Sequence, residues 1–299
     1  MPLSRVEIRP QRRFADIPCL VGTLPKIFAT KLETTTARGM VFVAVGEPAE
    51  PPYVNDQFSD IEFWRPIKGD VQADIKDALE NFLDPTHTVF VHKQLVRTVT
   101  NTNRTTVEIT AKGQNVVARY LCEGQAGGVV AALMNEKDRA LSVGRFVGPN
   151  VAEVEFHGPN SVNFVMIGYM TPTRDGMVAG YGLVGLPGPK WWSRLKCWLL
   201  YPWIRLVHSQ DQTILARTRA NNDLFPDVPT IIGPLDVIRG YIDAILSGKP
   251  TLRAAKPGSL RWICSSLFAP FAPDAAQFFR DVRGNPADGG DTRLRAEPR

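Results

Sequence analysis

The sequence from Thr105 to Gly185 constrains the fold most, because it is a succession of short segments with apolar or alternating character. Gly, Asn or Pro residues separate these segments, which include TTVEIT, NVVARYLCE, AEVEFHG and VNFVMIGYMTP. Alternation with a period of two is typical of β-strands, and the Asp-Gly pair at 175–176 is typical of a hairpin turn. Several strands joined by short connections predict one curved antiparallel sheet.

Helical patterns lie on both sides of these strands. From Asp70 to Leu83 the apolar residues fall on one helix face, Asp70 is the expected N-cap, and Pro85 should end or bend the helix. Segment 187–222 reads as a second helix, bent at Pro202, and 235–248 as a third. Helices before and after a long antiparallel sheet indicate an α+β fold.

The N-terminal part has a different texture. Residues 27–48 read as two strands around Ala37-Arg38-Gly39, and the Pro-rich stretch EPAEPPYVNDQ that follows marks a boundary. The Gly/Pro-rich polar end of the chain, GNPADGGDTRLRAEPR, is expected to be mobile. The predicted domains are therefore 1–52, 53–250 and a C-terminal extension, 251–299, that is partly disordered.

Composition excludes several classes of protein. The four cysteines are far apart and form no CxxC or CxH pair, which argues against a disulfide framework, a structural zinc and a cysteine-held iron–sulfur cluster. The net charge of +5 is spread along the chain, and no nucleic-acid-binding signature is present. The N-terminus lacks a signal-peptide core, and no apolar run of about 18 residues occurs. A cytoplasmic protein that does not bind nucleic acid is expected, with inert, buried thiols at Cys122 and Cys197.

Histidines are scarce, and two of the four lie close together. Asp84, His87 and His92 have the spacing D-x2-H-x4-H. Neutral imidazole is a good ligand for iron, zinc, copper or nickel, and two histidines with one carboxylate form the facial triad of non-haem Fe(II) oxygenases. Asp211, in HSQDQTIL, is the preferred third ligand, and His208 is its rival. The alternative is a pair of structural histidines at the end of a helix.

The segment ENFLDPTHTVFVH resembles the mononuclear-iron motif of the Rieske-type non-haem iron oxygenases, the aromatic-ring-hydroxylating family. It is most similar to the branch around vanillate demethylase, ketosteroid hydroxylase and pheophorbide oxygenase. RRFADIPC and RGMVFVAVGEPAEPP resemble the region around the end of the family's Rieske domain. HSQDQTILARTRANN resembles the late helix that supplies the acidic iron ligand. The resemblance covers roughly residues 10–250.

The resemblance implies a site and a fold. His87, His92 and Asp211 would bind mononuclear Fe(II), and Asp84 would be the carboxylate that links the iron to a Rieske cluster on a neighbouring subunit of a trimer. The catalytic domain would be a helix-grip (START-like) α+β domain at 53–250, and residues 1–52 a remnant of a β-rich Rieske domain. The family's C-x-H…C-x2-H motif, which holds a 2Fe-2S cluster, is absent, because no cysteine precedes Cys19 and no histidine precedes His87.

The implied activity is hydroxylation or demethylation of a hydrophobic, ring-containing substrate with O2. Electrons would come from a ferredoxin and reductase, or from a separate Rieske protein. The alternative is a redox-inactive accessory subunit, or a protein that binds a hydrophobic ligand in the same helix-grip cavity. A hydrolytic zinc enzyme with the same ligands is a third, weaker hypothesis.

Two further groups of residues stand out. Apolar residues close to the motif or on the strands are candidates for the lining of a cavity between the sheet and the helices. The alternative is that they are ordinary core residues. The aromatic and basic helix near Lys190 indicates a peripheral membrane contact or a substrate gate, or else an aromatic face packed on the sheet. His157 is expected at a strand end with a local hydrogen bond. The cavity candidates are Phe90, Val91, Phe164, Met166 and Tyr181, and the tryptophans are Trp191, Trp192, Trp198 and Trp203.

Overall fold

The computed structural model describes residues 32–44, 51–92, 95–96, 105–121, 134, 139, 141–173, 176–233, 235–249 and 260–262. Several sequence predictions fall outside these residues: those on the RRFADIPC segment, on Cys122 and on the C-terminal tail. In the described part of the chain, no helix combines the length and the apolar character needed to cross a membrane.

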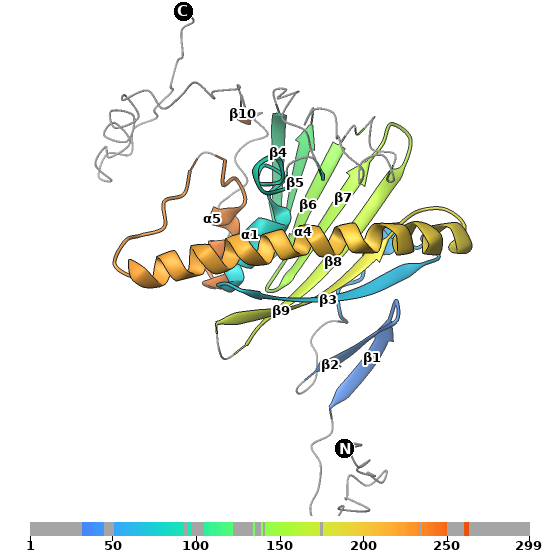
Figure 1. Ribbon diagram of the computed structural model, residues 1–299, viewed down its shortest axis with the longest axis horizontal. Helices are drawn as coiled ribbons and strands as arrows, with labels where there is room; N and C mark the ends of the chain where they lie inside the picture. Colours follow the sequence, from blue (N-terminus) through green and yellow to red (C-terminus); the bar gives the residue numbers. More distant parts are fainter. Residues whose placement is uncertain are drawn as a thin grey trace, which may run out of the picture.

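An eight-stranded antiparallel sheet forms the body of the protein (Figure 1). Strands that are consecutive in the sequence are neighbours in the sheet, except for the first and the last strand of the sheet in chain order. Most connections are therefore short. The α+β fold and the antiparallel sheet are thus confirmed. In sheet order the strands are β10 (Leu260–Trp262), β4 (Thr105–Lys112), β5 (Asn115–Leu121), β6 (Leu141–Val147), β7 (Val151–His157), β8 (Val162–Pro172), β9 (Met177–Gly185) and β3 (Trp64–Gln72).

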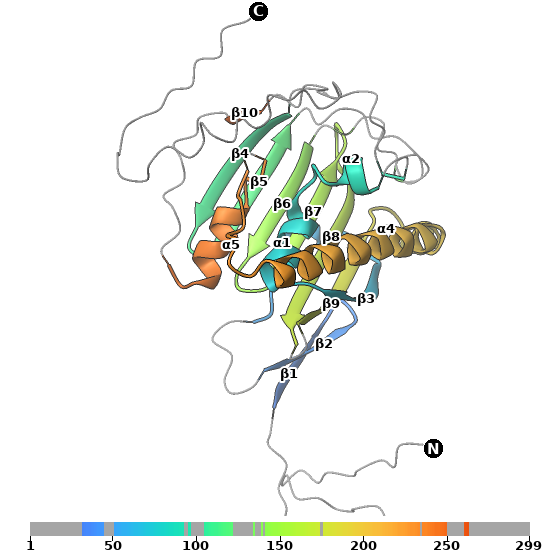
Figure 2. The ribbon, with the colours of Figure 1, turned by 60° about the vertical axis from the view of Figure 1, so that its left-hand side comes forward.

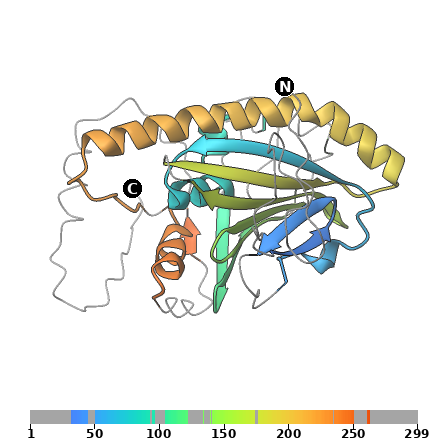
Figure 3. The same cartoon turned by 90° about the horizontal axis from the view of Figure 1, so that it is seen from below.

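The helices lie on one face of this sheet. They are α1 (Ile75–Leu83), α2 (Thr88–Val91), α4 (Lys190–Leu224) and α5 (Arg239–Leu246). Figure 2 shows α1 between α4 and α5 over the strands. Helix α4 has 35 residues and runs along the edge strand β3, and Pro202 lies inside it. Seen from below, the axis of α4 changes direction in its N-terminal part (Figure 3), in agreement with the predicted bend.

Alternation along the strands gives the sheet two apolar faces. On β8, Phe164 belongs to the core on the helix side, whereas Val165 and Ile167 belong to a core on the other side. Residues from 53–64 cover that second face, and Phe58 and Ile61 are buried there. Since side chains of a strand point alternately to opposite faces, one strand serves both cores.

Helix α1 begins later than predicted. Asp70 is not an N-cap, because it lies in β3, which pairs with β9 over the nine residues Trp64–Gln72. The N-cap is Asp74, whose carboxylate accepts a hydrogen bond of 2.9 Å from the Lys76 amide. The end of the helix is as predicted: Leu83 is its last residue, directly before Asp84 and Pro85. Asp70 and Val71, which continue the helical period of the sequence, therefore belong to the edge strand β3 because they pair with β9.

The N-terminal hairpin consists of β1 (Glu33–Ala37) and β2 (Met40–Ala44), which pair around Arg38 and Gly39. Both turn residues have positive φ, 50° and 81°, as a two-residue hairpin turn of this kind requires. The guanidinium of Arg38 stacks 4.0 Å from the centre of the Trp64 ring, and Phe42 packs edge-on against Tyr169. The hairpin therefore packs on the face of the sheet opposite to the helices. Whether residues 1–52 form a domain remnant stays a prediction.

A buried polar cluster lies on that same far face. The Glu153 side chain has no solvent exposure, and its carboxylate accepts hydrogen bonds from Asn55 (2.6 Å) and Arg145 (3.0 Å). Arg145 also donates to Glu155 (2.6 Å), which accepts a further bond of 2.8 Å from His157, at the end of β7 as predicted. Burial, with the neighbouring Glu155 charge, raises the pKa of Glu153 to about 7.

Replacing Glu153 with Gln should flatten the pH dependence of stability. Between the ordinary pKa of 4.5 and the folded value of about 7, the folded protein retains the Glu153 proton that the unfolded chain has lost. The free energy of unfolding must therefore fall as the pH rises through this window, by about 1.4 kcal/mol per pH unit from this group. Urea unfolding across the window measures the slope. The exposed Glu108→Gln variant on β4 is the control, and an unchanged slope in Glu153→Gln would contradict the assignment.

Candidate metal centre

The break after α1 places the two histidines of the motif. Pro85 cannot continue the helix, and the Asp84 carboxylate accepts hydrogen bonds from the Thr86 amide (2.7 Å), the Thr86 hydroxyl (2.8 Å) and the His87 amide (3.1 Å). This turn leads into α2, a single helical turn that has His87 at its N-cap and His92 at its C-cap. The two rings therefore extend from opposite ends of one short helix.

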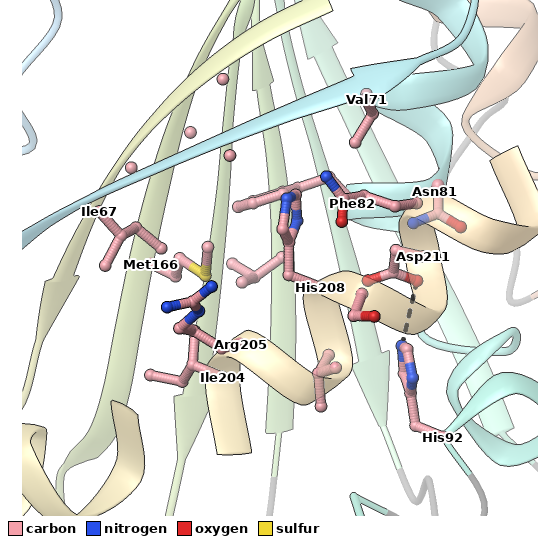
Figure 4. A pocket seen from close by; sticks show the side chains of 18 of the residues that line it. Ile67, Val71, Asn81, Phe82, His92, Met166, Ile204, Arg205, His208 and Asp211 are labelled. Carbon is pink, nitrogen blue, oxygen red and sulfur yellow. Dashed lines mark ion pairs between the residues drawn. The ribbon is translucent and has the colours of Figure 1, made fainter. Parts of the chain in front are cut away.

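Asp211 meets both histidines from α4. Its Oδ1 atom lies 3.1 Å from Nε2 of His92 and 3.5 Å from Nε2 of His87, and the two Nε2 atoms are 3.3 Å apart. Figure 4 shows Asp211 on its helix facing His92. Within the described residues, these three side chains form the group whose donor atoms could hold one metal ion. The sequence prediction thus named three residues that the fold brings together.

The second ring nitrogen of each histidine is held by an oxygen. Nδ1 of His87 lies 2.6 Å from the backbone carbonyl of Asp84, and Nδ1 of His92 lies 2.8 Å from Oε1 of Gln210. Because these oxygens only accept, each Nδ1 donates its proton to them, and each Nε2 faces Asp211, where a neutral ring offers its lone pair to a metal. Sequence reasoning missed Gln210, since nothing in the D-x2-H-x4-H spacing indicates which helix neighbour of Asp211 would reach His92.

The geometry and electrostatics of these three atoms fit a divalent cation. Burial raises the pKa of Asp211, but the adjacent His87 and His92 rings outweigh burial and hold that pKa far below its usual range. Oδ1 of Asp211 is buried and has no well-aligned donor. A metal about 2.1 Å from three donors sets them roughly 3.0 Å apart on an octahedral face and roughly 3.4 Å apart in a tetrahedron. The observed edges of 3.1, 3.3 and 3.5 Å match this range.

Asp84 and His208, the other predicted site residues, lie apart from this triangle. The Asp84 carboxylate is 4.0 Å from Nδ1 of His87 and binds the turn, so the backbone carbonyl of Asp84 is the group that orients His87. His208 does not join the three donor atoms, because its ring packs on β3 at Gly69, where any side chain would overlap it.

A cavity of about 750 Å³ adjoins the His87, His92 and Asp211 side chains, between the helix-facing side of the sheet and the helices. Among the predicted lining residues, Phe164 and Met166 line it from β8, and Tyr181 lies at its rim with an exposed side chain. Phe90 and Val91 do not line it, since α2 turns them away from the cavity and Phe90 is exposed. Other lining residues are Ile67, Phe82, Val154, Phe156, Leu200, Ile204 and Leu215.

Glycines form part of the floor of this cavity. Gly69 pairs with Gly180 between β3 and β9, and Gly168 pairs with Gly182 between β8 and β9. All four line the cavity. The His208, Phe82 and Ile67 side chains occupy the space that a Cβ would need at Gly69, Gly168 and Gly182, so these glycines let side chains pack directly on the strand backbone. Sequence reasoning did not single out these glycines, because their contribution depends on strand register.

No family model matches the sequence, and no curated protein sequence matches it. Solved structures match the fold. The crystal structure of dicamba monooxygenase bound to 3,6-dichlorosalicylic acid aligns with a TM-score of 0.63 and 12% identity over 81% of this chain and 77% of that chain. Pseudomonas putida CBB5 NdmA with caffeine aligns with a TM-score of 0.57 and 13% identity over 80% of this chain and 69% of that chain. At these identities the likeness establishes a shared fold.

Replacing Gly180 with Ala should destabilise the sheet at the cavity floor. An added Cβ would lie 2.6 Å from the backbone oxygen of Gly69, which cannot move without disturbing the β3–β9 pairing. We expect a loss of about 1–3 kcal/mol in the free energy of unfolding, measured with urea. Gly240→Ala in α5 is the matched control, because no atom lies within 4 Å of its added Cβ. That variant should gain up to about 1 kcal/mol. Equal stability of Gly180→Ala and the parent would contradict the packing described.

Proposed function

We propose that this chain is the mononuclear-iron oxygenase component of a Rieske-type system, acting on a hydrophobic, ring-containing substrate. The observation that carries the proposal is the convergence of Nε2 of His87, Nε2 of His92 and Oδ1 of Asp211 beside an apolar cavity. The resemblance of ENFLDPTHTVFVH to the family motif and the fold shared with dicamba monooxygenase support it independently.

Two imidazoles and one carboxylate are the donor set of non-haem Fe(II) oxygenases. Fe(II) held by His87, His92 and Asp211 would supply the activation of dioxygen for hydroxylation or demethylation. The protein's own part is to fix the ligands. The Nδ1–H groups donate to the Asp84 carbonyl and to Gln210, so both Nε2 lone pairs are aimed before a metal arrives.

The cavity supports a hydrophobic substrate. Its walls are mainly apolar side chains from β3, β7, β8, α1 and α4, and they adjoin the three proposed ligands. Such walls exclude water and orient an apolar ring system by shape, with few directional contacts. Dicamba monooxygenase and NdmA, which share the fold, are seen with the ring compounds dicamba and caffeine, respectively.

We further propose that electrons reach the site from outside the chain, from a ferredoxin and reductase or a separate Rieske protein. The proposal rests on the sequence, which has no C-x-H…C-x2-H motif for a 2Fe-2S cluster. The Asp84 side chain is a quarter exposed beside His87, so a neighbouring subunit of a homotrimer, or a donor protein, could reach it. In this role Asp84 would connect the donor to the iron ligand His87.

Iron binding tests the proposal directly. Protein prepared without oxygen and titrated with Fe(II) should bind about one iron per chain and contain no acid-labile sulfide. His87→Ala, His92→Ala and Asp211→Ala should each abolish tight binding, because each removes one of three ligands. His208→Ala, the rejected rival, is the control and should keep the iron. Equal iron binding by His87→Ala and the parent would overturn the oxygenase assignment.

The cavity by itself also supports a redox-inactive protein that binds hydrophobic ligands. In that case no tight iron site exists, and His87→Ala leaves the binding of an apolar fluorescent probe intact. The buried Asp211 carboxylate and its pair of aimed lone pairs favour the iron site, because a simple ligand carrier needs neither.

Replacing Gln210 with Ala should weaken Fe(II) binding by about 10- to 100-fold without removing the site. The change deletes the acceptor that holds Nδ1 of His92, and outer hydrogen-bond partners of this kind typically contribute that much affinity. Competition with a chromophoric chelator measures the affinity. Thr213→Ala is a matched control on the same helix, because its hydroxyl donates to the Ser209 carbonyl (2.9 Å) within the helix instead of contacting a ligand. Equal affinities of the two variants would contradict the role of Gln210.

A further inference from the structure

The outer face of the N-terminal third of α4 is apolar and exposed. Trp191 and Trp198 are 69% and 66% exposed, and Leu195 and Leu206 are 40% and 42% exposed. These residues, with Pro202, follow one another at steps of four, three, four and four, so they form one continuous stripe along the helix. We call Trp191, Leu195, Trp198, Pro202 and Leu206 the outer stripe. Trp192 and Leu199 are exposed next to it.

The outer stripe does not pack on the sheet, which was one of the two expectations for these tryptophans. Trp203 does pack inward, against the core around Leu200. The yellow N-terminal end of α4 projects past the strands in Figure 1. Two large, rigid indole side chains are therefore held in solvent on a helix whose other side is anchored in the core.

Charges around the outer stripe are nearly all positive. From Lys190 to Gln210 the sequence has four cations, Lys190, Arg194, Lys196 and Arg205, and no acidic residue. Lys190 and Arg194 are exposed. Glu62 is the nearby acid, and its carboxylate accepts a bond of 3.0 Å from the Lys190 amide at the helix start. The surface therefore complements an anionic, partly apolar partner.

We propose that the outer stripe binds the surface of a membrane that contains anionic lipids. A helix that combines exposed Trp and Leu with Lys and Arg lies in the headgroup region, where indole rings are favoured and each cation gains from anionic headgroups. The absence of acidic residues along 190–210 distinguishes this face from a typical contact between proteins, where both signs of charge meet. The helix binds at the surface and does not span the membrane.

This contact would bring the cavity to the lipid. Leu200, Tyr201 and Ile204 line the cavity from the side of α4 opposite to the outer stripe. If the cavity is the substrate site proposed above, an apolar substrate could enter from the bilayer along α4. Lipid binding itself needs no iron, so it succeeds or fails independently of the oxygenase proposal.

Flotation of the full chain with lipid vesicles tests the proposal. The protein should bind vesicles of phosphatidylcholine mixed with phosphatidylglycerol, with a blue shift of tryptophan fluorescence, and bind vesicles of phosphatidylcholine alone much more weakly. Lys190→Gln with Arg194→Gln should reduce binding by about 5-fold for each cation removed. Trp191→Ala with Trp198→Ala should remove the fluorescence shift and most of the binding. These side chains are exposed, so the variants should fold as the parent does.

Two control variants match the changes elsewhere on the surface. Lys112→Gln with Arg217→Gln removes two exposed cations away from the outer stripe, and Leu224→Ala removes an apolar side chain that is 74% exposed. Neither should alter vesicle binding by the amount seen for the stripe variants. Failure of the parent to bind mixed vesicles would overturn the proposal. In another outcome, the parent does not bind vesicles but forms an oligomer, and the double variant Trp191→Ala with Trp198→Ala dissociates that oligomer. This result would assign the face to contacts between copies of the chain.

Discussion

The docking of α4 on the edge strand β3 places Asp211 beside His87 and His92, which are far from it in the sequence. Gln212 donates to the Asp70 carbonyl, the His208 ring rests on Gly69, and the Arg65 guanidinium stacks 4.0 Å from the centre of the Tyr201 ring. These three contacts lie along the stretch of α4 that ends next to Asp211. The contacts also cover the open edge of the sheet, which would otherwise expose unpaired backbone groups. One helix therefore closes the sheet, roofs the cavity and carries the carboxylate of the candidate metal centre.

The two faces of the sheet are packed in different ways: the helix side has a cavity, and the far side has a filled core. On the helix side, glycines on three adjacent strands let the His208, Phe82 and Ile67 side chains pack directly on the backbone, beside a cavity of about 750 Å³. On the far side, Phe58, Ile61 and Ile167 form an apolar core, and the buried Glu153–Arg145–Glu155 cluster lies on the same face. Since empty apolar space costs packing energy, the far face and the α1–α5 core must supply the stability that the cavity floor lacks. A protein that binds no ligand has no physical need for a cavity on one face of its sheet.

The sequence predicted those parts of the structure that depend on local pattern. The strand run, the end of α1 before Pro85 and the hairpin at Arg38-Gly39 all follow from periodicity and turn chemistry. The spacing of His87 and His92 selected the candidate centre. Asp211 was selected in the later helical segment, and the resemblance of HSQDQTILARTRANN to a known family supported that choice. Prediction failed where pairing across the chain decides the outcome. Asp70 and Val71 continue a helical period but belong to β3, because β9 offers nine residues of pairing. Gln210 could not be predicted either, because it matters only through His92, which is 118 residues away in the sequence. The glycines of the cavity floor matter only through their partners on neighbouring strands.

Helix α4 carries two different surfaces, and their separation along its length has a mechanical consequence. Its middle, around Tyr201 to Gln212, is fixed on β3, whereas its N-terminal end, with Trp191, Leu195 and Trp198 of the outer stripe, projects past the strands. Pro202 lies between the two parts and removes one hydrogen bond of the helix, so bending there disturbs the helix least. Trp191 and Trp198 lie on one side of Pro202, and Asp211, anchored further along, lies on the other side against His87 and His92. The exposed aromatic end of the helix and the candidate metal centre therefore occupy separate parts of α4, joined at the residue where the helix bends most easily.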